Sequence, residues 1–445
     1  MVALFAAVLF AAACGDEAPR PMPQILEATA ARDMTGGQAL PSTTIAVRMD
    51  RDFSLASTRT PLASHFELLI HDVLGDSGNP TFVQTATRSA DDPRLFILEV
   101  SRLVPEGTTL SISRRAFREG DLGTLDAEVG SELTSAQAFF AETQFRFHDP
   151  AILGGAAGAG VSDPDEQDLD VQREALRDHL LARGANAEAI ALATARFDAL
   201  PEAIIPSPKL RAAVAALTGT FAEPAHDYLV SDQNCTGEPA SLVAFQPPPG
   251  RPELLARSTR ADDGRLVISI NPRLIGERIE HLMPVLAHEA IHCDDVDGLF
   301  EEVAATAFDT LLYIELLVKF PELPFTGTEL ARELNIDALA MLNSGRLIPE
   351  SGGVLPSAGL GPALPGSDTD YRSFADLVAA SYSRVSPNDS PAETIAVAYA
   401  GALAARTGMA LDDPFNLVYL DELIARSFSA DMLISLLETL GLEPA

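Results

Sequence analysis

The residues His288-Glu289-Ala290-Ile291-His292 constrain the fold of this chain more than any other feature of it. They form an H-E-x-x-H motif, in which the two histidines are four positions apart. Side chains at i and i+4 lie on one face of a helix, about one turn apart, so a helical segment brings His288 and His292 onto a single metal ion. Glu289 would then lie beside the metal, where it can act as a base. The motif predicts a helix that carries a zinc site.

The flanking sequence predicts where this helix begins and what packs against it. The β-branched run Leu266–Ile270 predicts a strand, and Asn271-Pro272 can cap and start the helix that follows. Apolar residues recur at helical spacing over 274–291, with Pro284 inside, where we expect a kink or a new start. After a turn, Leu299–Leu317 predicts a second long helix. Two helices joined by a short turn should face each other.

A catalytic zinc site generally has three protein ligands and one open position. All eight histidines of the chain lie at or before His292, so we expect the third ligand to be a carboxylate on the second helix. The candidates there are Glu301, Glu302 and, further along, Glu315. We favour Glu302.

With these two helices the chain resembles the gluzincin metallopeptidases, whose second helix supplies a glutamate followed by small residues and an aromatic. Glu302, followed by Ala305 and Phe308, fits that pattern, whereas a register that starts at Glu301 loses the phenylalanine. The resemblance covers residues 266–317 and implies a zincin-like domain.

The same resemblance implies a function for the motif. His288, His292 and Glu302 would bind zinc, which activates a water, and Glu289 would take the proton of that water as it attacks a peptide bond. Thermolysin-like members orient one histidine with an aspartate at the position of Thr306, so that support would be weaker here or would come from Asp309.

Two further elements of the site follow from the resemblance. The strand Leu266–Ile270 would be an edge strand that pairs with an extended peptide substrate. A tyrosine or histidine would stabilise the oxyanion formed from the substrate. The candidate tyrosines are Tyr313, Tyr371, Tyr382 and Tyr399.

The first residues predict export. Residues 2–13 are apolar but too few to span a bilayer, and small residues precede Cys14. This segment resembles a bacterial lipoprotein signal, with 1–13 removed and lipid on Cys14, although no basic residue precedes it and Ala11 stands where leucine is usual. An ordinary signal peptide is the alternative. Both predict a protein of the cell envelope, periplasmic or surface-exposed, and the first adds a membrane anchor.

Cysteine usage agrees with export. The chain has three cysteines, and if Cys14 carries lipid, Cys235 and Cys293 remain as a pair. In an oxidising compartment they could form a disulfide that ties residue 235 to the end of the metal helix. Two buried free thiols are the alternative.

We expect a multidomain fold with two folded units. Residues 23–148 contain short β-rich runs at 43–49, 66–71, 95–100 and 109–112, and resemble a bacterial Ig-like sandwich. An unrelated all-β domain is the alternative. A glycine-rich and acidic linker would span 149–170. Residues 171–445 would form a mainly α domain with a small sheet from the runs 242–245 and 266–270.

Composition restricts the partners. The chain has 64 acidic and 31 basic residues, and the net charge of −33 disfavours nucleic acid. Two classes of function remain. One is an exported, lipid-anchored zinc metallopeptidase that acts on peptides or proteins. The other is a non-catalytic surface lipoprotein with a binding or structural role.

Overall fold

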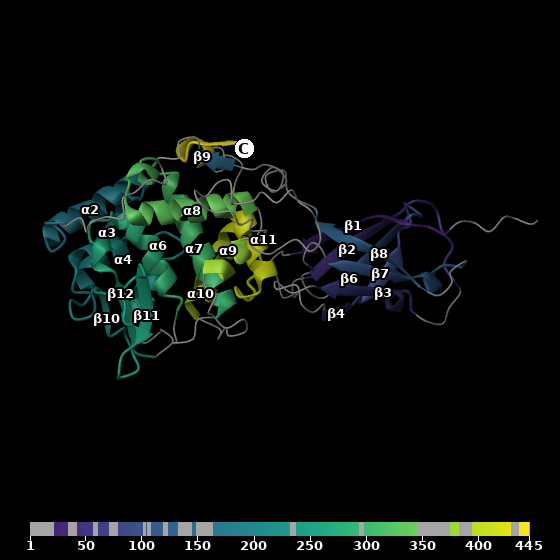
Figure 1. Cartoon of the computed structure of the whole chain (residues 1–445), viewed down its shortest axis with the longest axis horizontal. Helices are drawn as coiled ribbons and strands as arrows, with labels where there is room; N and C mark the ends of the chain where they lie inside the picture. Colours follow the sequence, from purple (N-terminus) through teal and green to yellow (C-terminus); the bar gives the residue numbers. More distant parts are fainter. Residues whose placement is uncertain are drawn as a thin grey trace, which may run out of the picture. The chain divides into compact units, whose positions relative to one another are not determined.

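The computed structural model describes residues 22–33, 42–56, 61–70, 79–100, 104, 108–118, 123–131, 145–147, 163–231, 237–292, 298–344, 374–381, 394–428 and 436–444. The chain divides into two compact units after Glu132 (Figure 1). The N-terminal unit is all-β, and the C-terminal unit is helical with a small sheet. The predicted lipidation site Cys14 and the predicted cysteine pair Cys235 and Cys293 lie outside the described residues, as does the glycine-rich stretch 154–160.

The N-terminal unit is built from strands that alternate buried and exposed side chains. Its strands are β1 (Ile25–Asp33), β2 (Ser42–Met49), β3 (Phe66–Ile70), β4 (Asn79–Phe82), β5 (Thr85–Arg88), β6 (Leu95–Val100), β7 (Thr109–Ser113) and β8 (Thr124–Ser131). They run in the order β4-β3-β7-β8-β1-β2-β6-β5, and the pair β1–β8 is parallel while the other neighbours are antiparallel. Phe53, Phe66, Phe96 and Phe117 pack together in the core. The all-β prediction is confirmed, and the Ig-like assignment stays a prediction.

The boundary between the units differs from the predicted one. The strand β9 (Phe145–Phe147) pairs with β13 (Leu442–Pro444) at the end of the chain, so it belongs to the helical unit and not to a sandwich that reaches residue 148. The acidic end of the predicted linker is also part of the helical unit. There Asp163 accepts a hydrogen bond of 2.7 Å from Lys209. Lys209 is only 5% exposed, and a buried ammonium group requires such a counter-charge.

The helical unit contains ten described α-helices. They are α2 (Leu169–Ala182), α3 (Ala187–Ala199), α4 (Pro208–Ala216), α5 (Pro224–Val230), α6 (Ile279–Glu289), α7 (Leu299–Leu317), α8 (Glu329–Ser344), α9 (Phe374–Ser381), α10 (Thr394–Thr407) and α11 (Leu417–Ser427). Within the described residues, none of these helices has the length and apolar character that crossing a bilayer requires.

Helix α7 lies at the centre of this unit (Figure 1). Nearly all its side chains are buried, because its sequence is apolar around the whole circumference. The helices α6, α8, α9, α10 and α11 pack around it. The polar residues Glu301, Glu302 and Asp309 are therefore carried into the interior, where each needs a partner.

The small sheet has the order β10-β12-β11, with β10 (Leu242–Phe245), β11 (Ala256–Arg260) and β12 (Leu266–Ile270). The prediction that Leu266–Ile270 is an edge strand is wrong. It is the central strand, parallel to β10 and antiparallel to β11, and it is almost entirely buried. A tight turn with Gly264 at a φ of +83° reverses the chain between β11 and β12, and this places the more polar β11 at the edge.

Candidate metal centre

The motif helix α6 is shorter than predicted. Asn271 caps a 3₁₀ turn at Pro272–Leu274, and α6 begins only at Ile279. It continues through Pro284, so the expected new start at this residue does not occur. His288 lies in its last turn, and His292 lies just beyond its end. The tight turn at the end of the helix, where the amide of Ile291 donates to the carbonyl of His288 at 2.9 Å, still keeps the two rings together.

The two histidines and Glu302 converge as predicted. The centroids of the His288 and His292 rings are 4.9 Å apart. The Nε2 atom of each histidine lies 3.7 Å from the same oxygen, Oε2 of Glu302. The three potential ligand atoms all lie within 4.8 Å of one another, and all three side chains are largely buried. The helices α6 and α7, separated by a short connection, bring these groups to one point.

Two further carboxylates hold the histidines. Nδ1 of His288 forms a hydrogen bond of 2.7 Å with Asp309, and Nδ1 of His292 forms one of 2.8 Å with Glu301. These bonds fix the planes of both rings, and a proton on Nδ1 would leave the lone pair of Nε2 for a metal. Asp309 thus provides the support that Thr306 cannot.

The remaining candidates for the third ligand have other positions. Glu301 binds Nδ1 of His292, on the side of the ring away from Nε2. Glu315 accepts a hydrogen bond of 2.9 Å from Arg406 and lies more than three turns of α7 beyond Glu302. Of the three glutamates, only Glu302 lies close to both Nε2 atoms.

Glu289 lies beside this cluster and is held by a residue that the sequence did not single out. Its Oε2 accepts a hydrogen bond of 2.8 Å from the hydroxyl of Ser258, on β11. The charge of Glu289 acts to raise the pKa of both His288 and His292. Ser258 was missed because the polar sequence of β11 gives no clear strand signal and no motif.

Two candidate oxyanion donors have other partners. The hydroxyl of Tyr313 donates to Asn335 at 2.7 Å. The hydroxyl of Tyr399, on α10, donates at 3.2 Å to the carbonyl of Ala287. In a regular helix the amide of Ile291 would donate to this carbonyl, but at the tight end of α6 it donates to His288. Both tyrosines are fully buried, so the structure does not support either as an oxyanion donor. The candidates Tyr371 and Tyr382 lie outside the described residues.

The cluster is rich in negative charge. Burial lowers the pKa of His292, but Glu302, Glu301 and Glu289 outweigh this effect and raise its pKa to about 10. Burial, reinforced by His292, lowers the pKa of His288. Three buried glutamates, Glu289, Glu301 and Glu302, thus surround the two imidazoles together with the carboxyl group of Asp309, whose pKa is raised well above its usual range by burial. A bound dication would compensate this charge.

The donor set fits zinc. Two imidazole nitrogens and one carboxylate oxygen are a known ligand combination of catalytic zinc sites, which leave a fourth position open. Bonds of about 2.0–2.1 Å in tetrahedral geometry place ligand atoms roughly 3.3 Å apart. The observed 3.7 Å between each Nε2 and Oε2 of Glu302 is close to that value. The group could therefore hold a metal ion with little movement.

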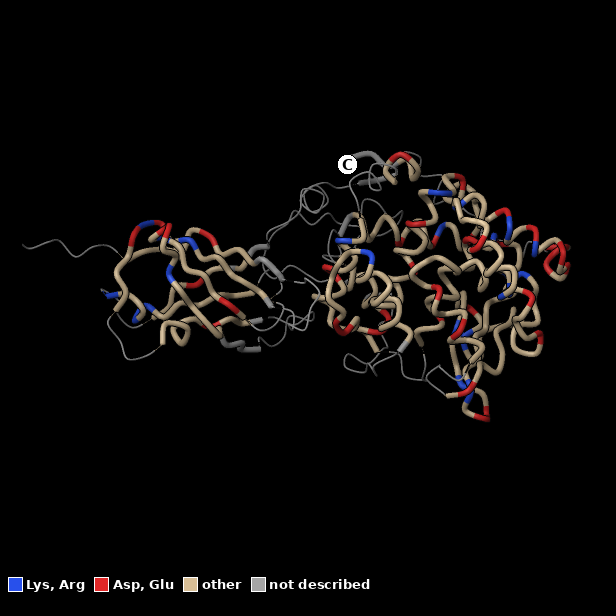
Figure 2. The backbone as a smooth tube through the Cα atoms, turned by 180° about the vertical axis from the view of Figure 1, so that it is seen from behind, with Lys and Arg blue, Asp and Glu red and all other residues tan. Residues whose placement is uncertain are grey.

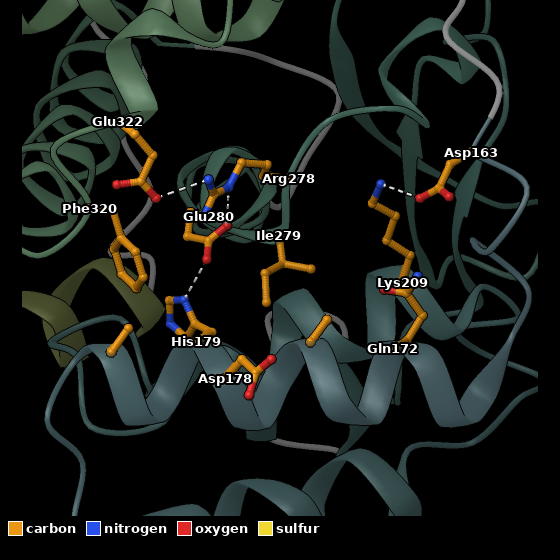
Figure 3. A pocket seen from close by; sticks show the side chains of 12 residues that line it. Asp163, Gln172, Asp178, His179, Lys209, Arg278, Ile279, Glu280, Phe320 and Glu322 are labelled. Carbon is orange, nitrogen blue, oxygen red and sulfur yellow. Dashed lines mark hydrogen bonds and ion pairs between the residues drawn. The ribbon is translucent and has the colours of Figure 1, made fainter.

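A second group of charged side chains, of which His179 and Glu280 are buried, lies at the opposite end of α6 and lines a pocket (Figure 3). Nδ1 of His179 donates to Glu280 at 3.1 Å, and Glu280 also accepts from Arg278, which binds Glu322 in turn. The ring of His179 stacks on Phe320, with centroids 5.0 Å apart. Here Arg278 is the cation that compensates the buried carboxylate of Glu280.

Comparisons of the chain with protein-family models, with curated proteins and with solved structures found no match. The site is therefore described by its own geometry.

Proposed function

We propose that the helical unit is a zinc-dependent metallopeptidase with His288, His292 and Glu302 as ligands and Glu289 as general base. The observation that carries this proposal is the convergence of both Nε2 atoms on one oxygen of Glu302, with Glu289 directly after His288 on α6. Zinc, when bound, would acidify a water and polarise the substrate carbonyl.

The chain's own residues have distinct roles in this proposal. Asp309 and Glu301 keep the Nε2 lone pairs of the histidines directed at the metal position. Glu289 takes the proton of the attacking water and passes it to the leaving amine. Tyr399 caps the last turn of α6 and so holds the backbone that carries the motif.

The strand proposed to bind the substrate is β11, and not β12. Because β12 is central, the strand with an open edge next to α6 is β11, which contacts that helix. An extended peptide could add to β11 and present its scissile bond near Glu289, whose carboxylate binds Ser258 of the same strand. Acidic residues occur along much of the helical unit (Figure 2), and the net charge of −33 would favour cationic peptides.

The proposed location is the cell envelope. The lipoprotein-like segment 1–13 and Cys14 support export and a lipid anchor, and the all-β unit would hold the peptidase away from the membrane. Export of the chain and labelling of Cys14 by a fatty-acid analogue, lost in Cys14→Ser, would test this part.

The test of the function combines metal content with hydrolysis. We expect one zinc per chain by elemental analysis of the purified protein, and none in His288→Ala. Glu289→Gln should retain zinc and lose hydrolysis of dye-labelled casein by several orders of magnitude. A wild-type protein that takes up no zinc even after reloading would remove the enzyme proposal and leave a binding or structural lipoprotein.

A further inference from the structure

We propose that Ser258 is a positioning residue for Glu289, and that its hydroxyl fixes the carboxylate of the base against the edge strand β11. This inference rests on the proposed function, in which Glu289 takes a proton from water. It concerns a residue that lies outside the H-E-x-x-H motif and 31 positions before Glu289.

The geometry is specific to this pair of residues. The Oγ atom of Ser258 lies 2.8 Å from Oε2 of Glu289 and 2.7 Å from the main-chain carbonyl oxygen of the same residue. An ionised carboxylate and a carbonyl only accept hydrogen bonds, so the hydroxyl must be the donor in both contacts. The hydroxyl has one proton, so it can form a full hydrogen bond with only one of the two oxygens at a time.

The side chain of Ser258 lies on the face of β11 that is turned toward the end of α6. Ser258 pairs with Ile268 of the central strand β12, and its hydroxyl reaches Glu289 on that helix. Side chains alternate along a strand, so Thr259 points to the opposite face. Ser258 is therefore the residue of this part of β11 that can reach the end of α6.

A held carboxylate is useful to a general base because proton transfer requires a defined direction. With Oε2 bound by Ser258, Oε1 is the oxygen that can take the proton of the water. Once Glu289 is protonated, the hydroxyl of Ser258 can turn to the carbonyl oxygen of Glu289, which is equally close. Ser258 keeps its own proton in both arrangements, and no other residue has to move.

The contact also joins the base to the proposed substrate strand. Ser258 lies on β11, to whose open edge an extended peptide would add, and it bonds both the side chain and the backbone of Glu289. A peptide that orders β11 would thereby also order the base.

The experiment compares Ser258→Ala with Ser258→Thr, which keeps a hydroxyl on a β-branched side chain suited to a strand. Ser427→Ala is the matched control, because it removes a half-buried serine hydroxyl that donates at 2.8 Å to the carbonyl of Leu423 on α11. For each zinc-loaded full-length variant, three quantities are measured: the zinc content, the kcat and KM for dye-labelled casein, and the orientation of the Glu289 carboxylate in a crystal structure.

We expect Ser258→Ala to keep its zinc and its KM but to lose about tenfold to a hundredfold in kcat, with the Glu289 carboxylate in more than one orientation. Ser258→Thr should restore most of kcat and the single orientation, and Ser427→Ala should resemble the wild type. A role confined to tethering the strand would lower stability without this selective loss of kcat.

Three results would overturn the inference. They are an unchanged kcat in Ser258→Ala, a Ser258→Thr variant as slow as Ser258→Ala, and a Glu289 carboxylate that keeps its orientation without the hydroxyl. The crystal structures decide the question even if the wild type hydrolyses no casein. In that case the proposed function fails, while the positioning of Glu289 by Ser258 is still confirmed or refuted.

Discussion

The two ends of α6 both bury a histidine against a carboxylate, yet they differ in what completes the group. At the N-terminal end, His179 and Arg278 both donate to Glu280, and Arg278 reaches on to Glu322 (Figure 3). At the C-terminal end, carboxylates bind the Nδ1 atoms of His288 and His292, and the Nε2 atoms face a further carboxylate.

The difference shows how to separate a structural ion pair from a candidate metal site. In the first group a protein cation, Arg278, binds the buried carboxylate of Glu280, so this carboxylate needs no added ligand. The second gathers lone pairs and negative charge at one point, an arrangement that a dication would stabilise. Burial and perturbed pKa values occur at both ends and do not by themselves indicate function.

The largest effect should come from removing a ligand at the C-terminal end. Glu302→Gln should weaken zinc binding by more than about a hundredfold, because a neutral amide oxygen replaces the only charged ligand. Glu315→Gln, on the same helix but bound to Arg406, is the control and should bind zinc like the wild type. Competition with a chromogenic chelator measures both. Equal affinities in the two variants would show that Glu302 is not a ligand.

At the N-terminal end the prediction concerns stability against pH. Burial opposes ionisation of Glu280, but its bonds to His179 and Arg278 prevail and lower its pKa from 4.5 to about 2. A lowered carboxyl pKa stabilises the fold above pH 4.5, and this contribution is lost as the pH falls toward 2. The shift corresponds to about 3 kcal/mol.

His179 also makes the fold less stable as the pH falls. Burial lowers its pKa below 6.5, so the unfolded chain binds a proton there first, and stability falls as the pH drops below 6.5. Urea unfolding of wild type and Glu280→Gln at several pH values would measure these effects. The stability difference between the two proteins should shrink below pH 4.5. Zinc affinity at pH 7 should be the same in both.

A smaller loss of zinc affinity is expected when the carboxylates that orient the histidines are neutralised. Asp309→Asn and Glu301→Gln should each lower zinc affinity about tenfold to a hundredfold, because the imidazole loses its fixed tautomer. Thr306→Val, on the same helix, removes a buried hydroxyl that makes no hydrogen bond and should leave the affinity unchanged. If both carboxylate variants bind zinc like the wild type, the two bonds are structural only.

The smallest effect should come from the cap of α6. Tyr399→Phe leaves the Ala287 carbonyl without its donor and should lower the free energy of unfolding by about 1–3 kcal/mol. Tyr313→Phe removes a comparable buried bond to Asn335, and its ring lies beside His281 in the first turn of α6, at the end opposite the motif. Chemical denaturation compares the two. Only Tyr399→Phe should also weaken zinc binding slightly, and equal zinc affinities would separate the cap from the site.

Local patterns predicted several elements closely. The predicted spans of α7, β6, β10 and β12 agree with the observed bounds, because apolar periodicity within one segment reports which of its faces are buried. The grouping of His288, His292 and Glu302 was also predicted. Two errors concern long-range contacts: the edge position of β12 and the boundary of the all-β unit at residue 148. The third, the start of α6, is local, because a 3₁₀ turn precedes the helix.

The sequence by itself determined the elements that carry the chemistry: a motif on the end of one helix, and a glutamate at the start of the next. Their spacing is a local property of the chain. Only the tertiary structure decided that Asp309 and Glu301 hold the imidazoles, that β11 is the edge strand, and that Ser258 binds Glu289. These contacts depend on how separate segments pack around α7, and burial forces a polar group to find a partner without specifying which one.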